Sequence, residues 1–175
     1  MSELLNWNNT VVPQRRPESG CIPTGYEWLI RYMRIQGVDL TKFQEEFDLG
    51  RNNNNFDSVA AKIMSRYPTI NIHRQGERDF PKGVDKVARI KSLVEKQIPC
   101  LISLTLQKDS WHIMPVVYVD DTTMEMIHDG IRGVNCIWKL GIKEIVWKHD
   151  NLQGGKDISW IDSVPSIVSS ASDVS

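Results

Sequence analysis

The order of hydrophobic and polar residues divides the chain into a helical first half and a strand-rich second half. Hydrophobic residues recur at helical spacing after residue 20 and again after residue 83. From residue 100 they form short runs separated by Asp, Gly and Asn turns, a pattern typical of strands. Helices followed by antiparallel strands predict an α+β fold, with helices packed on one sheet.

Four helices are expected. The first begins near Cys21, because Pro23 suits a first helical turn, and it ends at Gly37, because glycine readily takes the left-handed capping conformation. Thr41 is the expected N-cap of the second helix, and Pro68 ends the third. The second and third helices are Thr41–Phe47 and Ser58–Tyr67, and the fourth is marked by Val84, Val87, Ile90, Leu93 and Val94.

The remaining chain is expected to consist of an arm, six strands and a tail. Residues 1–20 show no regular period and predict an extended arm on the surface, whereas the Ser-rich residues 163–175 predict a disordered tail after one domain at 1–162. The expected strands are Thr69–His73, Cys100–Leu106, Ile113–Val119, Met124–Ile127, Val134–Lys139 and Glu144–Trp147.

Composition narrows the class of protein. A chain of 175 residues fits one domain, and a net charge of −1 argues against a dedicated nucleic-acid binder. No run approaches the roughly 18 apolar residues of a membrane span, and the first residues lack a secretory signal, so we expect a cytoplasmic protein with no membrane partner. Three widely spaced cysteines predict neither disulfides nor a metal site, and no cofactor is expected.

Cys21 is the candidate nucleophile. It stands where a helix is expected to begin, directly after Ser19 and Gly20. The positive end of the helix dipole and the unpaired N–H groups there favour a thiolate and lower the pKa of a cysteine. The same N–H groups are suited to an oxyanion formed on an attacked carbonyl. The alternative interpretation is a buried structural cysteine that packs under the helix.

His112 is the candidate base, and Asp129 is the candidate residue that orients it. In an antiparallel hairpin the numbers of paired residues have a constant sum. A turn at Asp120-Asp121 gives a sum of 241, which pairs His112 with Asp129, and a turn over residues 120–123 gives 243, which leaves the two diagonal on one face. Opposed residues have Cβ atoms ~5 Å apart, so a carboxylate can hold the imidazole. Taken singly, the two residues are equally well explained as a rim histidine and a turn aspartate.

Gln14 is a candidate oxyanion donor, because it precedes Cys21 in the expected arm and its amide can reach back over the nucleophile. An exposed loop glutamine is an equal alternative, and Asn8 and Asn9 are weaker candidates. Other reactive residues fit a catalytic role less well. They are His128, expected on the opposite face from Asp129, His73 in the intervening segment, His149 in a late loop, Cys100 and Cys136 in core strands, and Asp120 and Asp121 in a turn.

Together these residues resemble the papain-fold cysteine peptidases, and most closely the bacteriocin-leader (double-glycine) peptidases and their stand-alone relatives. The resemblance implies a peptidase with Gln14 as oxyanion-hole donor, Cys21 as nucleophile, His112 as general base and acid, and Asp129 as orienter. Two positions differ, since Ile22 and Trp111 stand where the family usually or often has glycine. The resemblance is carried by Gln14, the segment Ser19–Thr24, the segment Trp111–Val117 and the tripeptide His128-Asp129-Gly130.

Three functions remain open from the sequence. The leading hypothesis is a peptidase or isopeptidase that acts on a peptide or protein through a Cys21 thioester. An acyltransferase, amidase or deamidase shares the same first half-reaction. A non-catalytic peptide-binding module is the third hypothesis, although all four site positions carry chemically competent residues. The oligomeric state is not predicted.

Overall fold

A computed structural model describes residues 2–16, 20–107, 110–131 and 134–162, with the side chains of residues 107 and 129–131 excepted. The tail predicted at 163–175 lies outside the described residues. The helices are η1 (Trp7–Asn9, a 3-10 turn), α1 (Cys21–Met33), α2 (Phe43–Phe47), α3 (Phe56–Arg66), α4 (Gly83–Glu95) and α5 (Ile142–Asn151). The strands are β1 (Ser2–Glu3), β2 (Asn71–Gln75), β3 (Cys100–Gln107), β4 (Ser110–Val119), β5 (Thr123–Ile131), β6 (Val134–Gly141) and β7 (Ile158–Asp162).

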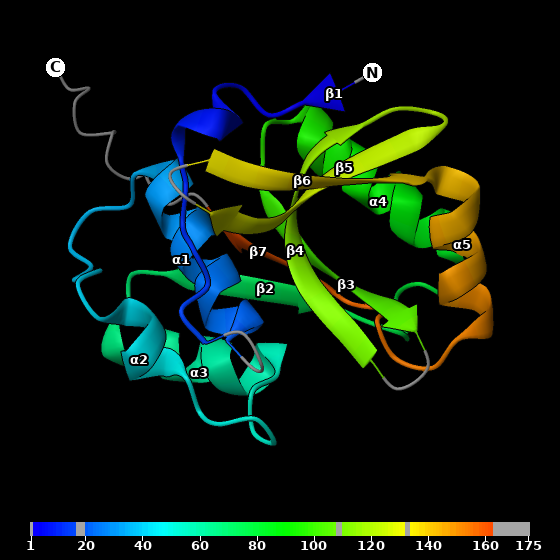
Figure 1. The fold of residues 1–175 in the computed structure, drawn as a ribbon. Coiled ribbons are helices and arrows are strands. Elements are labelled where there is room, and N and C mark those ends of the chain that lie inside the picture. Colours follow the sequence, from blue (N-terminus) through cyan, green and yellow to red (C-terminus); the bar gives the residue numbers. More distant parts are fainter. Residues whose placement is uncertain (1, 17–19, 108–109, 132–133, 163–175) are drawn as a thin grey trace, which may run out of the picture.

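The strands form one antiparallel sheet of seven strands in the order β2-β7-β3-β4-β5-β6, with β1 beside β4 (Figure 1). The α+β architecture expected from the sequence is therefore confirmed. Each hairpin of β3 to β6 is sequential, whereas β7 returns from the end of the chain and inserts between β2 and β3.

Helices cover both faces of this sheet. On one face α1 packs so closely that a Cβ at Gly25 would lie 2.9 Å from the Leu101 side chain. On the other face, charges on Lys86 and Arg89 of α4 act on the thiol of Cys100. Because neighbouring residues of a strand point to opposite faces, α1 and α4 lie on opposite sides of β3.

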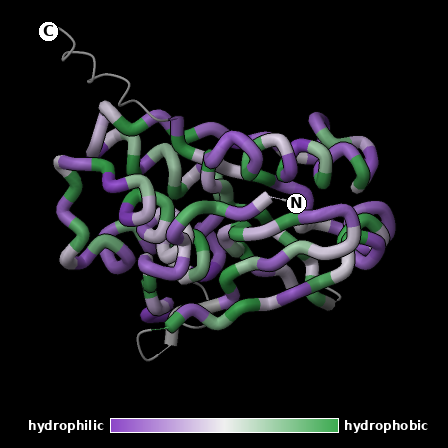
Figure 2. The backbone as a smooth tube through the Cα atoms, turned by 90° about the horizontal axis from the view of Figure 1, so that it is seen from above, coloured by the Kyte–Doolittle hydropathy of each residue, from purple (hydrophilic) through white to green (hydrophobic). Residues whose placement is uncertain are grey.

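The core is continuous through the sheet and its helices. In Figure 2 hydrophobic and hydrophilic residues alternate along the helices and strands, which is the pattern of elements with one buried face.

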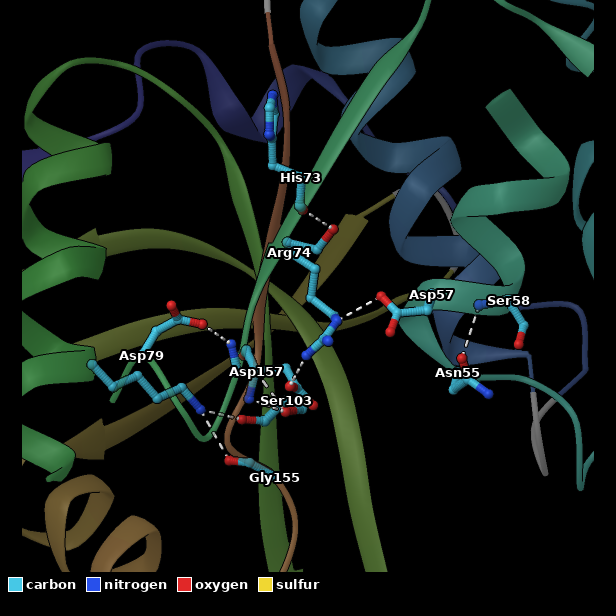
Figure 3. A network of polar contacts seen from close by, with 12 residues as sticks. Asn55, Asp57, Ser58, His73, Arg74, Asp79, Ser103, Gly155 and Asp157 are labelled. Atoms are coloured by element: carbon cyan, nitrogen blue, oxygen red, sulfur yellow. Dashed lines mark hydrogen bonds and ion pairs between the residues drawn. The ribbon is translucent and has the colours of Figure 1, made fainter. Parts of the chain in front are cut away.

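Polar side chains at the edge of the sheet connect elements that are distant in the sequence. Arg74 of β2 donates to Asp57 of α3 (2.6 Å) and to Asp157, just before β7 (2.9 Å, Figure 3).

The sequence prediction was wrong at two places near the C-terminus. Residues 144–147, expected as a strand, belong to α5, where Ile142, Ile145 and His149 recur at helical spacing. A four-residue apolar run does not distinguish a strand from a helix turn. Strand β7 was not expected, yet Ile158 and Ile161 are fully buried in the sheet.

Two predicted helix ends also differ. Helix α1 ends at Met33 because Arg34 takes the left-handed conformation (φ 56°) and its N–H bonds the carbonyls of Ile30 and Arg31. Gly37 adopts the expected positive φ, but it lies beyond the helix. Helix α2 begins at Phe43 with Lys42 at the N-cap, so the capping role expected of Thr41 is wrong.

Candidate active site

Cys21 is the first residue of α1 and is half-buried. The helix start predicted at this residue is therefore confirmed. Gly20 forms the N-cap, and its backbone N–H donates to the carbonyl of Arg16 (2.9 Å). The side chain of Thr24 contacts the carbonyl of Gly20 from the next turn (2.6 Å). These contacts fix the turn from which the Cys21 thiol projects.

Two influences act on the pKa of the Cys21 thiol in opposite directions. Burial is the largest influence and raises the pKa of Cys21 above its ordinary value. The backbone groups of Ile113, Cys21 and Ile22 act in the opposite direction and lower the pKa by a smaller amount. The sequence-based expectation of a lowered pKa is therefore wrong for this state, because the helix-start donors do not offset desolvation. The donors themselves are present as expected.

A narrow pocket of about 20 Å³ opens beside the thiol, with room for little more than one water molecule. Gln14 and Cys21 both line this pocket, so the structure brings together these two predicted residues. The Nε2 group of Gln14 donates to the carbonyl of Arg16 (2.8 Å). The lining is completed by Val12, Thr24, Gly25 and Trp28 from the arm and α1, Ile113 and Pro115 from β4, and Ile127 and His128 from β5.

His112 lies on β4 next to Ile113, but it is not among the described residues that line this pocket. Its Nε2 atom lies 3.3 Å from the carbonyl oxygen of His128, and the two imidazole centroids are 5.0 Å apart. The structure therefore joins His112 to His128, and His128 to the pocket of Cys21.

The register of the β4–β5 hairpin explains this arrangement. Val119 pairs with Met124, a sum of 243, as the longer predicted turn requires. A register shift between Val116 and Tyr118 then changes the sum to 242, because Val116 pairs with Met126. The pairs next to the turn therefore follow the longer of the two predicted turns, and the pairing of His112 with Asp129 stays a prediction.

A second register shift lies in the pairing of β5 with β6, where Ile127 pairs with Ile137 but Asp129 pairs with Cys136. It leaves His128 as the extra residue of a bulge, and a bulge interrupts the alternation on which sequence parity depends. The argument that separated His128 from Asp129 assumed a regular strand and does not hold here. The side chain of Asp129 lies outside what the structure describes, so its orienting role stays a prediction.

His128 is the residue that the sequence reasoning set aside and that the structure places at the pocket. Its ring packs edge-on against Trp138 (centroids 5.7 Å apart, 81° between planes) and beside His112. The adjacent Asp129 drew attention in the sequence, and the histidine beside it was rejected only on parity. No pattern in the sequence predicted the bulge at His128.

The remaining candidates have structural explanations. Cys100 is buried as expected, and burial raises its pKa to about 12, whereas Cys136 is only half-buried. His149 lies in α5 rather than in a loop and contacts the carbonyl of Phe80 (2.9 Å). His73 pairs with Asp162 across β2 and β7. Asp120 accepts hydrogen bonds from the backbone N–H groups of Thr122 and Thr123 in its turn. Asn8 and Asn9 are exposed in η1.

Within the described ranges, no cluster of His, Cys, Asp or Glu side chains is suited to hold a metal ion. In the same ranges, no helix has the length and apolar character needed to cross a bilayer.

Comparison with known proteins supports the fold. No family model and no curated protein matches the chain. Among solved structures, it is similar to a protein from Bacillus anthracis provisionally described as a C39-like peptidase, with a TM-score of 0.62 over 93% of this chain and 98% of that chain. At 13% identity this likeness establishes the fold alone. The chain thus has the α+β, papain-like fold of the C39-type cysteine peptidases, and the narrower bacteriocin-leader group stays a prediction.

Proposed function

We propose that the chain is a cysteine peptidase that hydrolyses a peptide or isopeptide bond through a thioester on Cys21. The observation that carries the proposal is the environment of the sulfur. The backbone at Cys21 and Ile22, at the start of α1, and at Ile113 of β4 favours the charged form of this one atom, as hydrogen-bond donors do. Such convergent donors are what an oxyanion next to the attacking atom requires. A purely structural cysteine has no need of them.

The raised pKa of Cys21 favours attack by a thiol that is neutral at rest. A histidine then takes the thiol proton as the sulfur bonds the carbonyl carbon, and His112 is the residue that we assign to this step. The negative charge that develops on the carbonyl oxygen is stabilised by the helix-start N–H groups and by the amide of Gln14.

The second half of the reaction completes the balance. The protonated histidine gives its proton to the leaving nitrogen, the C–N bond breaks, and the amine product departs. Water, deprotonated by the same histidine, then attacks the thioester and releases a carboxylic acid and the free thiol. Asp129 orients the imidazole in this proposal, as the resemblance implies.

A peptide-binding module without catalysis is the second candidate. Two observations favour it, namely the raised pKa of Cys21 and the position of His112 outside the described lining of the pocket. An acyltransferase, amidase or deamidase differs only in the acceptor or in the bond attacked, and shares the thioester with the peptidase.

The decisive test is covalent capture by a set of peptide vinyl sulfones, which form a stable thioether with a reactive cysteine, with the adduct located by mass spectrometry. We expect capture at Cys21 that is lost in Cys21→Ala and in His112→Ala. Cys136→Ala is the matched control, because Cys136 is also free and half-buried. For substrates found in this way, a product mass increased by one water across a cleaved bond identifies hydrolysis. Capture that ignores both Cys21 and His112 excludes the enzyme and leaves the binding module.

A further inference from the structure

Gln44 of α2 is a buried glutamine whose amide lies at the centre of a hydrogen-bond network. Its Nε2 group donates to the carbonyl of Pro13 (2.9 Å) and to the carboxylate of Glu27 (3.0 Å). Its Oε1 atom accepts from the backbone N–H of Arg15 (2.9 Å) and contacts the hydroxyl of Thr24 (2.8 Å). A side-chain amide has two donor hydrogens and two acceptor lone pairs. These four contacts therefore use its whole capacity.

The two arm contacts of Gln44 bracket a single residue, Gln14. One contact holds the carbonyl of Pro13 and the other holds the N–H of Arg15, so the backbone is fixed on both sides of the candidate oxyanion donor. The backbone groups of an extended segment have no partners within a helix, so they take hydrogen bonds from neighbouring elements. Gln44 supplies them at the point where position matters for the site.

The other two contacts of Gln44 reach the helix that carries the nucleophile. Thr24 lies one turn after Cys21, and its hydroxyl also contacts the carbonyl of Gly20 (2.6 Å). Glu27 lies one turn further and is itself buried, with an ion pair to Arg31 (2.7 Å). One amide thus joins the arm that carries Gln14 to the first two turns of α1.

The carbonyl of Arg16 makes a second connection between the same partners. It accepts from Nε2 of Gln14 (2.8 Å) and from the N–H of Gly20, directly before Cys21 (2.9 Å). The plane of the Gln14 amide is therefore tied to the turn that presents the thiol. Both connections act on the placement of one amide relative to one sulfur.

We propose that Gln44 is a positioning residue, which holds the arm so that the Gln14 amide meets the oxyanion formed at Cys21. The inference rests on the proposed function. The loss of one oxyanion donor lowers catalysis by ~100- to 1,000-fold, and a misplacement of ~1 Å costs about 100-fold. A displaced arm in a Gln44 variant should therefore reproduce much of the effect of removing the Gln14 amide.

Two reactions of Cys21 separate positioning from general damage. Acylation by p-nitrophenyl acetate forms an S–C bond through a tetrahedral oxyanion and expels p-nitrophenolate. Alkylation by iodoacetamide displaces iodide directly and forms no oxyanion. We expect Gln14→Ala and Gln44→Met each to slow acylation of Cys21 by at least about tenfold while the alkylation rate stays within about twofold. The double variant should be no slower than Gln14→Ala, because both changes remove the same interaction.

Controls make every outcome decisive. Gln36→Met is the matched surface substitution and should change neither rate, because Gln36 is exposed and its amide donates to the nearby carbonyl of Arg34. Circular dichroism melts establish that each variant is folded. If Gln44→Met does not fold, Gln44→Glu replaces it, because a carboxylate keeps the accepting oxygen but loses both donors. Equal losses in both reactions, or multiplied losses in the double variant, overturn the positioning role. If Cys21 of the unmodified chain is alkylated but never acylated, the proposed function fails instead.

Discussion

The carbonyl oxygen of Arg16 accepts the backbone N–H of Gly20 at 2.9 Å, and a Cβ atom at Gly20 would lie 2.9 Å from the same oxygen. The backbone angles of Gly20 (φ −90°, ψ 13°) are open to other residues, so the constraint is the approach of the carbonyl rather than conformation. The contact of Gly20 with the Arg16 carbonyl therefore leaves no room for a methyl group directly before Cys21. Because the same carbonyl holds the Gln14 amide, Gly20 couples the two residues.

The first prediction concerns Gly20→Ala. The added methyl group must push the Arg16 carbonyl away, which should slow acylation of Cys21 by at least about tenfold and destabilise the fold by about 1–3 kcal/mol. Stopped-flow acylation and urea denaturation measure the two effects. Gly141→Ala is the matched control, because Gly141 is also a helix N-cap but its Cβ would meet nothing closer than 3.8 Å. A Gly20→Ala variant that behaves like the control contradicts the proposed closure.

The second prediction concerns the thiol of Cys21. Burial raises its pKa, so the midpoint of its alkylation rate against pH should lie above the value of about 8.5 of an ordinary cysteine. The rate of iodoacetamide modification, followed by peptide mass spectrometry from pH 6 to 10.5, tests this. His112→Ala should leave the midpoint in place if the histidine acts only during attack. A midpoint well below 8.5 that rises in His112→Ala would instead demonstrate a resting thiolate–imidazolium pair.

The third prediction separates the two histidines. His112→Ala should slow acylation of Cys21 by about 100- to 10,000-fold, the range expected for loss of a general base. His128→Ala should slow it by less than about tenfold, because the contact from His128 to His112 comes from the backbone carbonyl, which the substitution keeps. Acylation rates of both variants are compared at pH 7, with His73→Ala as control for a histidine paired elsewhere. A larger loss in His128→Ala would assign the base to the histidine that lines the pocket.

Long periodic segments were predictable, because their signal survives small errors in length. The helix at Cys21 and the alternating strands from Cys100 onward give the α+β fold directly. Segments too short to show a period were not predictable. Taken alone, the run at residues 144–147 is consistent with a strand. The helix becomes evident only when Ile142 and His149 are included, because they continue the same buried face as Ile145.

The candidate site was predictable only where it depends on local structure. The position of Cys21 follows from a helix start, and the position of Gln14 follows from an arm that returns to it. The role of His112 depended on regular pairing between β4 and β5, and a register shift between Val116 and Tyr118 interrupts that pairing without any turn residue to mark it. A second shift, between Ile127 and Asp129, interrupts the pairing of β5 with β6. The role of Gln44 could not be predicted for a different reason. In the sequence, a buried glutamine in a five-residue helix cannot be distinguished from a glutamine on the surface.

The last prediction concerns Lys86 of α4, which is fully buried. Its ammonium group donates to the carbonyls of Ser103 (2.6 Å) and Gly155 (3.0 Å), residues that lie together in Figure 3. Burial lowers the pKa of Lys86 to about 7 against the ordinary 10.5, with a partial opposing effect from Asp157. Above pH 7 the unfolded chain therefore binds more protons at this residue than the folded chain, and the free energy of unfolding rises with pH.

The slope from Lys86 should approach about 1.4 kcal/mol per pH unit between pH 7 and 8.5, and it should vanish well below pH 7, where both states are charged. Urea denaturation of the unmodified chain and of Lys86→Met at half-unit pH intervals isolates the contribution as a difference. That difference removes the opposite effect of Cys100, whose raised pKa lowers stability above about pH 8.5 in both proteins. Lys91→Met, the same change at the partly exposed Lys91 of the same helix, should keep the slope of the unmodified chain, because its pKa is raised by Asp121 and lies outside this window. Parallel curves for the unmodified chain and Lys86→Met would mean that the buried amine keeps its proton throughout, held by the two carbonyls.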